Sequence, residues 1–201
     1  MTGSPSDNAG SPAWSHLFSD HSRNWYDNVY VYPVISRRSE GLSIGINLNP
    51  DKVCNFNCIY CQVDRSIPST VHRVDLERLG DELDAMIRLA ASGELFRGGP
   101  LAMTPPSLRT MRDIAFSGDG EPTASPVFLE AVQLAARLRK DHALDTVRLR
   151  VITDAAFLGK QRVKEALSIL HANNGEIWAK LDAGTEEYFR IVNRAHVPLA
   201  G

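Results

Sequence analysis

The sequence predicts an α/β protein, most simply a partial parallel (β/α) barrel that shows about four strand-helix units. From Gly41 onward, short apolar runs alternate with segments of helical period, and alternating strands and helices give a parallel sheet with right-handed crossovers. At 201 residues and 43% hydrophobic content the chain can bury one sizeable core. We expect a core over residues 41–201, after an aromatic-rich extension (13–40) and a disordered polar start (1–12).

The strands are expected at four places. Leu42, Ile44, Ile46 and Leu48 alternate with small or polar residues, and Asn49-Pro50 ends this first strand. The buried runs at residues 114–116, 147–152 and 177–181 are the next three.

The helices follow these strands. Apolar residues at helical spacing predict one over residues 75–91, which Gly93 ends, and another over residues 160–171 before an Asn174-Gly175 turn. Ser125-Pro126 predicts an N-cap and a first-turn proline for the second helix. Thr185, followed by two glutamates, predicts the start of a fourth.

The extension is marked by its aromatic side chains. We expect it to pack over the outside or one end of the barrel. Its aromatic residues are Trp14, Phe18, Trp25, Tyr26, Tyr30 and Tyr32.

Charge and hydropathy limit the possible partners. The formal net charge is -2 and the pI is about 6.3, so the whole surface carries no electrostatic footprint for nucleic acid, although a local basic patch fits within a neutral average. No apolar stretch is long enough to span a bilayer, and the first residues lack the basic and apolar regions of a signal peptide. We therefore expect no membrane partner and a cytoplasmic, reducing location.

Cys54, Cys58 and Cys61 are the three cysteines of the chain. One tight loop can bring thiolates at this spacing onto three corners of a metal cluster, which leaves the fourth corner without a protein ligand. A disulfide framework would need an even count, and a structural zinc site normally has four protein ligands. Zinc and three inert cysteines remain alternatives to an iron-sulfur site.

Distinctive residues also follow the later strands. Gly118, Asp119, Gly120 and Glu121 come after the second strand, and glycines there let backbone approach a ligand closely. In parallel barrels the ligand site forms at the carboxyl ends of the strands. The third and fourth ends supply Thr153, Asp154, Lys180 and Asp182. The competing interpretation is an ordinary turn and solvated loop charges.

The cysteine spacing C-x3-C-x2-C, with Tyr60 before the last cysteine, resembles the signature of the radical S-adenosylmethionine (radical SAM) superfamily. The Gly-Asp-Gly-Glu-Pro loop resembles that superfamily's Gly-Gly-Glu-Pro element, with Asp119 at the second glycine. The resemblance implies that the cysteines hold a catalytic [4Fe-4S] cluster. It further implies an S-adenosyl-L-methionine (SAM) site with these candidates: Tyr60, Gly118, Asp119, Gly120, Glu121, Thr153, Asp154, Lys180 and Asp182.

Residues 28–194 more specifically resemble a branch of iron-sulfur oxidoreductases grouped with wyosine-type tRNA synthases. The resemblance rests on residues 32–38, the Gly-x-Ser-x-Gly-Ile before the cysteines, Gly-Glu-Pro-Thr at 120–123, and residues 178–185. Two departures stand out. No cysteine precedes Cys54, so we expect no second cluster in this chain, which argues against tricyclic base synthesis. The units are also fewer than in the superfamily core, so we expect either a truncated core or a partner that supplies the missing wall, and an exposed last strand around residues 177–181.

The resemblance implies an enzyme that cleaves SAM reductively to a 5'-deoxyadenosyl radical, with electrons from a flavodoxin- or ferredoxin-like donor. An RNA substrate would need a basic entrance, for which Arg37, Arg38, Arg65 and Arg73 are candidates. Arg37 and Arg38 could instead neutralise the cofactor carboxylate or a substrate phosphate. A protein substrate, as for activases of glycyl radical enzymes, needs an open barrel side. The remaining alternative is a non-catalytic iron-sulfur or zinc binding module.

Overall fold

The computed structural model describes residues 17, 23, 25–195, 197 and 199. Our expectations for the polar start and for Trp14 and Phe18 fall outside these residues. No helix in the described ranges combines the length and apolarity needed to cross a membrane.

A five-stranded sheet with the order β1-β2-β3-β4-β5 organises the described chain. Strands β2 to β5 pair in parallel, and β1 pairs antiparallel with β2. The predicted α/β fold with four parallel strands is thereby confirmed. The strands are β1 (Val31–Ser36), β2 (Gly41–Ile46), β3 (Met111–Phe116), β4 (Arg148–Thr153) and β5 (Gly175–Ala179).

Strand β1 is a difference from the expectation. The sequence predicts an extension outside the core over residues 13–40, but Val31 to Ser36 pair residue by residue with Ile46 to Gly41. Tyr30 and Tyr32 are buried as well. Pro33 within the run is compatible with this position, because an edge strand can leave one backbone position without a donor.

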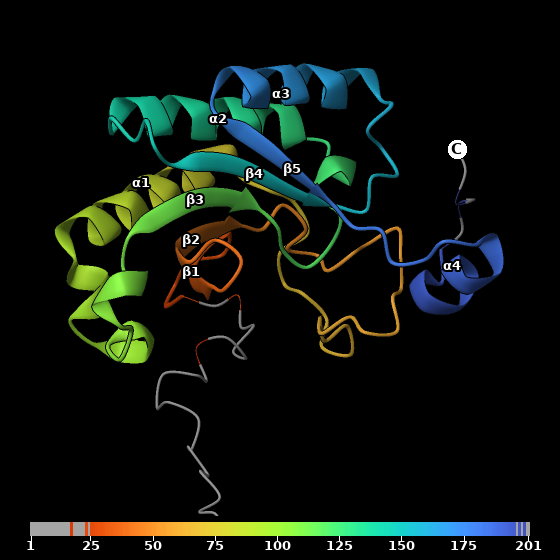
Figure 1. Ribbon diagram of the computed structural model, residues 1–201, viewed down its shortest axis with the longest axis horizontal. Coiled ribbons are helices and arrows are strands. Elements are labelled where there is room, and N and C mark those ends of the chain that lie inside the picture. Colours follow the sequence, from red (N-terminus) through yellow and green to blue (C-terminus); the bar gives the residue numbers. More distant parts are fainter. Residues whose placement is uncertain (1–16, 18–22, 24, 196, 198, 200–201) are drawn as a thin grey trace, which may run out of the picture.

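Helices α1, α2 and α3 lie on one face of the sheet (Figure 1). Asp75 caps α1 by accepting from the N–H groups of Glu77 and Arg78. As predicted, Gly93 ends the helix, with a left-handed φ of 74°. The helices are α1 (Leu76–Ser92), α2 (Phe128–Asp141), α3 (Gln161–Ala172) and α4 (Glu186–Asn193). Short 3-10 helices span Glu94–Phe96, Gly99–Leu101, Pro106–Leu108 and Pro122–Ala124.

The predicted start of the second helix was wrong by two residues. Ser125 ends the short 3-10 helix that follows β3, and α2 begins at Phe128 after Val127. The Ser125 carbonyl, rather than its side chain, accepts the N–H of Phe128 at 3.2 Å. The Glu-Pro-Thr sequence starts its own turn before the helix can form, and this turn was not anticipated.

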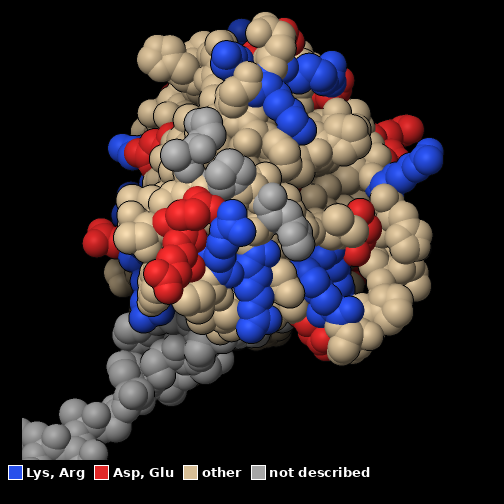
Figure 2. All heavy atoms as spheres, turned by 90° about the vertical axis from the view of Figure 1, so that its right-hand side faces the viewer, with Lys and Arg blue, Asp and Glu red and all other residues tan. Residues whose placement is uncertain are grey.

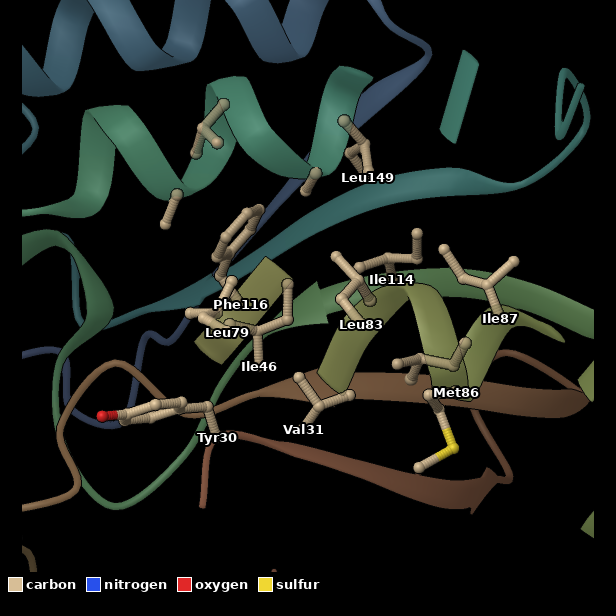
Figure 3. Close-up of a cluster of buried hydrophobic side chains, with 14 of the residues drawn as sticks. Tyr30, Val31, Ile46, Leu79, Leu83, Met86, Ile87, Ile114, Phe116 and Leu149 are labelled. Atoms are coloured by element: carbon tan, nitrogen blue, oxygen red, sulfur yellow. The ribbon is translucent and has the colours of Figure 1, made fainter. Parts of the chain in front are cut away.

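The two faces of the sheet differ in chemistry because side chains alternate along each strand. The helix-facing side holds the apolar core, to which α1 contributes Leu79, Leu83, Met86 and Ile87 (Figure 3). The opposite side carries small and polar residues, among them Ser43, Gly45, Asp113, Ala115 and Ser117. The apolar face therefore stabilises the fold, and the polar face is left to line a cavity.

Strand β5 is the edge of the sheet opposite β1. It ends at Ala179, so Lys180 and Leu181 lie beyond the strand that was expected to include them. Helix α4 lies apart from the other helices, beyond the carboxyl ends of the strands, and Thr185 caps it as predicted.

Candidate cofactor site at the strand ends

A cavity of about 530 Å³ opens along the polar face of the sheet and reaches the carboxyl ends of the parallel strands. It brings together most of the residues that the sequence singled out. Its lining includes Cys54, Cys58, Tyr60, Cys61, Gly118, Asp119, Gly120, Glu121, Asp154 and Lys180. Thr153 and Asp182 are absent from the lining, although both bond to residues that belong to it.

The cysteine loop follows β2 and is bonded to the last turn of α4. The N–H groups of Asn57 and Ile59 donate to the carbonyls of Asn193 and Val192, at 3.0 and 2.9 Å. These carbonyls are free to accept because the last turn of a helix leaves them without intrahelical partners. Phe56 packs edge-on against Phe189, with ring centroids 5.4 Å apart. A second small hydrophobic cluster therefore fixes the loop on the helix.

The three thiols have different surroundings. Burial raises the pKa of the Cys54 thiol. Burial also acts to raise the pKa of Cys61, but the hydrogen bond from Arg65, the backbone hydrogen bond from Val63 and the Arg65 charge together outweigh it, and the pKa is lowered. Cys58 receives the side-chain amide of Asn193 at 3.5 Å. All three cysteines are free thiols.

Within the described residues, no group of three or more Cys, His, Asp or Glu side chains is arranged so that it could hold a metal ion. The three thiols line one cavity, and their softness suits iron-sulfur chemistry. Several buried polar atoms beside the cysteine loop also lack a well-formed hydrogen bond among the described residues. They are Asn55 Nδ2, Asp154 Oδ2 and Asn193 Oδ1. Such atoms normally find a partner, so the site has the donors and acceptors that a bound group would use.

The Gly-Asp-Gly loop packs tightly against the segment before the cysteines. A Cβ added at Gly118 would lie 2.3 Å from Asn47 Oδ1, and one at Gly120 would lie 2.2 Å from the Val53 carbonyl oxygen. Asp119 accepts from Asn47 at 2.8 Å and pairs with Arg23 at 3.1 Å. Both glycines are thus needed for close approach, and the carboxylate is held by its own partners.

Glu121 is buried, and its carboxylate is fully engaged within the protein. One oxygen accepts from the N–H and hydroxyl of Thr123 and from the Thr153 hydroxyl at 2.6 Å. The other accepts the N–H of Asp154 at 2.7 Å. The side chain therefore ties the loop after β3 to the end of β4. Its predicted cofactor contact stays a prediction.

Asp154 is the titratable group of the cavity with the clearest perturbation. Burial, followed by the charge of Glu121, raises its pKa to about 6. One of its oxygens accepts the N–H of Ala156 at 3.0 Å, and the Asn55 side chain acts to lower the pKa. The other oxygen, Oδ2, is buried and has no hydrogen bond of good geometry among the described residues. The carboxylate is therefore poised to accept a hydrogen bond from a ligand hydroxyl.

Tyr60 and Lys180 meet at the mouth of the cavity. The Lys180 ammonium lies 4.7 Å from the centre of the Tyr60 ring and 3.9 Å from an Asp182 oxygen. The Tyr60 hydroxyl donates to Asp182, which also accepts from Asn193 at 2.7 Å. Partial burial and the Asp182 carboxylate raise the pKa of Tyr60. Asp182 therefore acts here as a link between the cysteine loop and α4.

Sequence reasoning missed a buried ionic network that borders the far end of the cavity. Asp113 pairs with Arg150 and accepts from Ser43, and all three side chains are buried. Arg150 also donates to Glu176 at 2.8 Å and lies 4.4 Å from the centre of the Trp178 ring. The signal was present in β4, where Arg148 and Arg150 alternate with Leu149 and Val151, because charges that alternate with core residues must face the opposite side.

Two of the arginines proposed for an RNA entrance have partners within the protein. Arg38 lies over Trp178, at 4.9 Å from the ring centre, and Arg65 donates to Cys61 and to the Asp119 carbonyl. Figure 2, viewed from the side of α4, shows Lys and Arg interleaved with Asp and Glu. This face of the molecule is therefore mixed in charge.

Comparisons with known proteins give distant relatives. No family model matches the chain. The chain is 26% identical over 167 residues to a UPF0026 protein of Methanocaldococcus jannaschii, covering 83% of this chain and 44% of the relative. It is 25% identical over 162 residues to a protein named GTPase Obg from Brachyspira hyodysenteriae, covering 81% of this chain and 20% of that protein. The chain thus spans less than half the length of each.

A solved structure, described as TYW1 with a lysine-pyruvate adduct bound, matches with a TM-score of 0.43 and 18% identity. That match covers 78% of this chain and 47% of the other. At these values the likeness adds nothing about function.

Proposed function

We propose that this chain is the cofactor-binding core of a radical SAM enzyme. In this proposal Cys54, Cys58 and Cys61 hold a [4Fe-4S] cluster, and the Gly-Asp-Gly loop binds SAM beside it. The observation that carries the proposal is one cavity, at the carboxyl ends of parallel strands, lined by three thiols, a glycine-rich loop, Asp154 and Lys180. The same edge of parallel barrels is where ligands bind in general.

The chemistry belongs to the cofactors, which together would supply a 5'-deoxyadenosyl radical after one-electron reduction. The protein's part is to bind, orient and exclude water. Gly118 and Gly120 let their loop pack closely against the segment before the cysteines, which sets the wall of the cavity. The buried Oδ2 of Asp154 can accept from a ligand hydroxyl. Lys180 can pair with a carboxylate, since its ion pair with Asp182 is long at 3.9 Å.

The partners extend the proposal. A flavodoxin- or ferredoxin-like protein would donate the electron, and the substrate would be RNA. The RNA proposal rests on the resemblance, since the face beside α4 is mixed in charge. Co-purification of RNA with the chain, lost on raising the salt concentration, would support it. Radical transfer to a protein instead would favour the activase alternative.

The test of the enzyme proposal is anaerobic reconstitution with iron and sulfide. We expect a cluster whose absorption spectrum changes on adding SAM, and 5'-deoxyadenosine on reduction. Cys58→Ala should abolish both, while Asn57→Ala, an exposed side chain in the same loop, should not.

Two results would contradict the proposal. One is 5'-deoxyadenosine formation at the wild-type rate by Cys58→Ala. The other is a chain that takes up zinc at one ion per molecule and releases no heat with SAM, which would support the non-catalytic module.

A further inference from the structure

Arg65 donates to three acceptors on both sides of the cavity. Its Nε donates to the Lys52 carbonyl at 3.0 Å, and Nη1 to the Cys61 sulfur at 3.2 Å. Its Nη2 donates to the Asp119 carbonyl at 3.1 Å. One guanidinium therefore joins the cysteine loop to the Gly-Asp-Gly loop.

The contact with Lys52 is reciprocal. The Lys52 ammonium donates to the carbonyls of Asp64 and Ile67, at 2.8 and 3.0 Å, while Arg65 donates to the carbonyl of Lys52 itself. Residue 52 has a left-handed φ of 61°, a conformation that needs support from its surroundings. These bonds thus join the two ends of the segment from Lys52 to Ile67, which contains the three cysteines.

The residue type suits this arrangement. Arginine presents its donors in a rigid planar fork, whereas lysine has a point charge on a flexible stem. Asp119 is itself held by Asn47 and Arg23, so the carbonyl that Arg65 reaches belongs to a fixed loop. A lysine could keep the charge but would lose the simultaneous contacts with Cys61, Lys52 and Asp119.

We propose that Arg65 is a positioning residue, which locks the cysteine loop against the Gly-Asp-Gly loop and places a positive charge beside the Cys61 sulfur. A ligand bound between the loops would then be held in one position and orientation. The second part of the inference rests on the proposed function. Hydrogen bonds and charge near the sulfurs of a cluster set its reduction potential, and a nearby cation favours the reduced state.

The experiment compares Arg65→Gln and Arg65→Lys with a control, Arg88→Gln, which removes an exposed arginine of α1 that pairs with Asp84. Amide hydrogen exchange is measured on the chain without cofactors. In both Arg65 variants, exchange at residues 52–61 and 117–121 should rise about tenfold or more, the factor expected for loss of a hydrogen bond to a charged group. The control, and the helices α1 and α2 in every variant, should exchange as in the wild type.

Redox titration of the reconstituted chain measures the reduction potential of the cluster and so tests the effect of the Arg65 charge. Arg65→Gln should shift the potential to more negative values, and Arg65→Lys should restore part of the shift.

Unchanged exchange in Arg65→Gln would overturn the positioning role, whether or not a cluster binds. Raised exchange with a wild-type potential would overturn the role of the charge. Failure of the wild type to take up iron would contradict the proposed function instead, and the exchange measurement would still decide whether Arg65 locks the loops.

Discussion

Gly120 shows how a single residue serves both packing and the site. The nearest atom to an added Cβ would be the backbone oxygen of Val53, which cannot move without displacing the cysteine loop. Gly159, by contrast, is exposed and has no atom within 4 Å of such a Cβ.

We therefore predict that Gly120→Ala lowers the free energy of unfolding by about 1–3 kcal/mol, the usual effect of overpacking. Gly159→Ala should stay within about 0.5 kcal/mol of the wild type, as surface substitutions do. Urea denaturation of both variants measures the difference. Equal stabilities would mean that the two loops do not approach as closely as the structure has them.

Asp154 gives a prediction about pH at the same scale. Its pKa is raised from 3.8 to about 6 in the folded chain, first by burial and then by Glu121. The folded state therefore binds more protons than the unfolded state between these values, and stability contributed by the protonated group is lost as the pH rises from about 4 to about 6.

Asp154→Asn should consequently be more stable than the wild type at pH 7, by about 1 kcal/mol, since partial exposure screens the charge. The gain should vanish near pH 4. Unfolding curves of both proteins across this range, without cofactors, test it. A gain that does not depend on pH would show that the Asp154 charge is not the cause.

At the scale of elements, Glu82 connects helix α1 with strand β1. Its buried carboxylate accepts the N–H groups of Val29, Tyr30 and Val31, at 2.9, 2.8 and 3.1 Å. Arg78, one turn earlier, donates to it at 2.8 Å. One side chain of the helix that covers the sheet thus holds the start of the edge strand, in addition to the pairing of β1 with β2.

Glu82→Gln should lower the free energy of unfolding by about 2 kcal/mol. The glutamine NH2 group would face backbone N–H groups that need an acceptor, and the negative charge of the carboxylate would be lost. Amide exchange should rise first in residues 29–36. Asp81→Asn, on the exposed side of the same helix turn, is the control and should behave as the wild type. Unaltered exchange in β1 would show that strand pairing alone holds it.

At the scale of the whole molecule, the sheet has an open edge. Among the described residues β5 pairs with β4 alone, and Ile177 on it is 44% exposed. Unpaired backbone groups beside apolar side chains are a template for association with another chain.

We predict that the 201-residue chain self-associates as its concentration rises, and that Ile177→Lys reduces this, because a charge on an edge strand opposes pairing. Tyr26→Lys, which changes another exposed apolar residue away from this edge, should not. Light scattering measures both. A wild-type chain that stays monodisperse and monomeric at every concentration would mean that the edge is harmless.

The sequence alone was enough for the four parallel strands, the cap residue Thr185, the end of α1 at Gly93, and the loops that meet at the strand ends. These features are local, since apolar periodicity, cap chemistry and the alternation of strands with helices can be read over short stretches. The cysteine loop and the Gly-Asp-Gly loop could be placed at one edge because parallel strands bring their carboxyl ends together.

Only the tertiary structure decided how distant residues are used. The start of the edge strand β1 is held by Glu82, about fifty residues away, and Arg65 meets Asp119 across the cavity. The full engagement of Glu121 by Thr123, Thr153 and Asp154 could not be foreseen either. A polar side chain looks the same in sequence whether it faces water, a ligand or a buried partner, and its role follows from the donors and acceptors that folding places within reach.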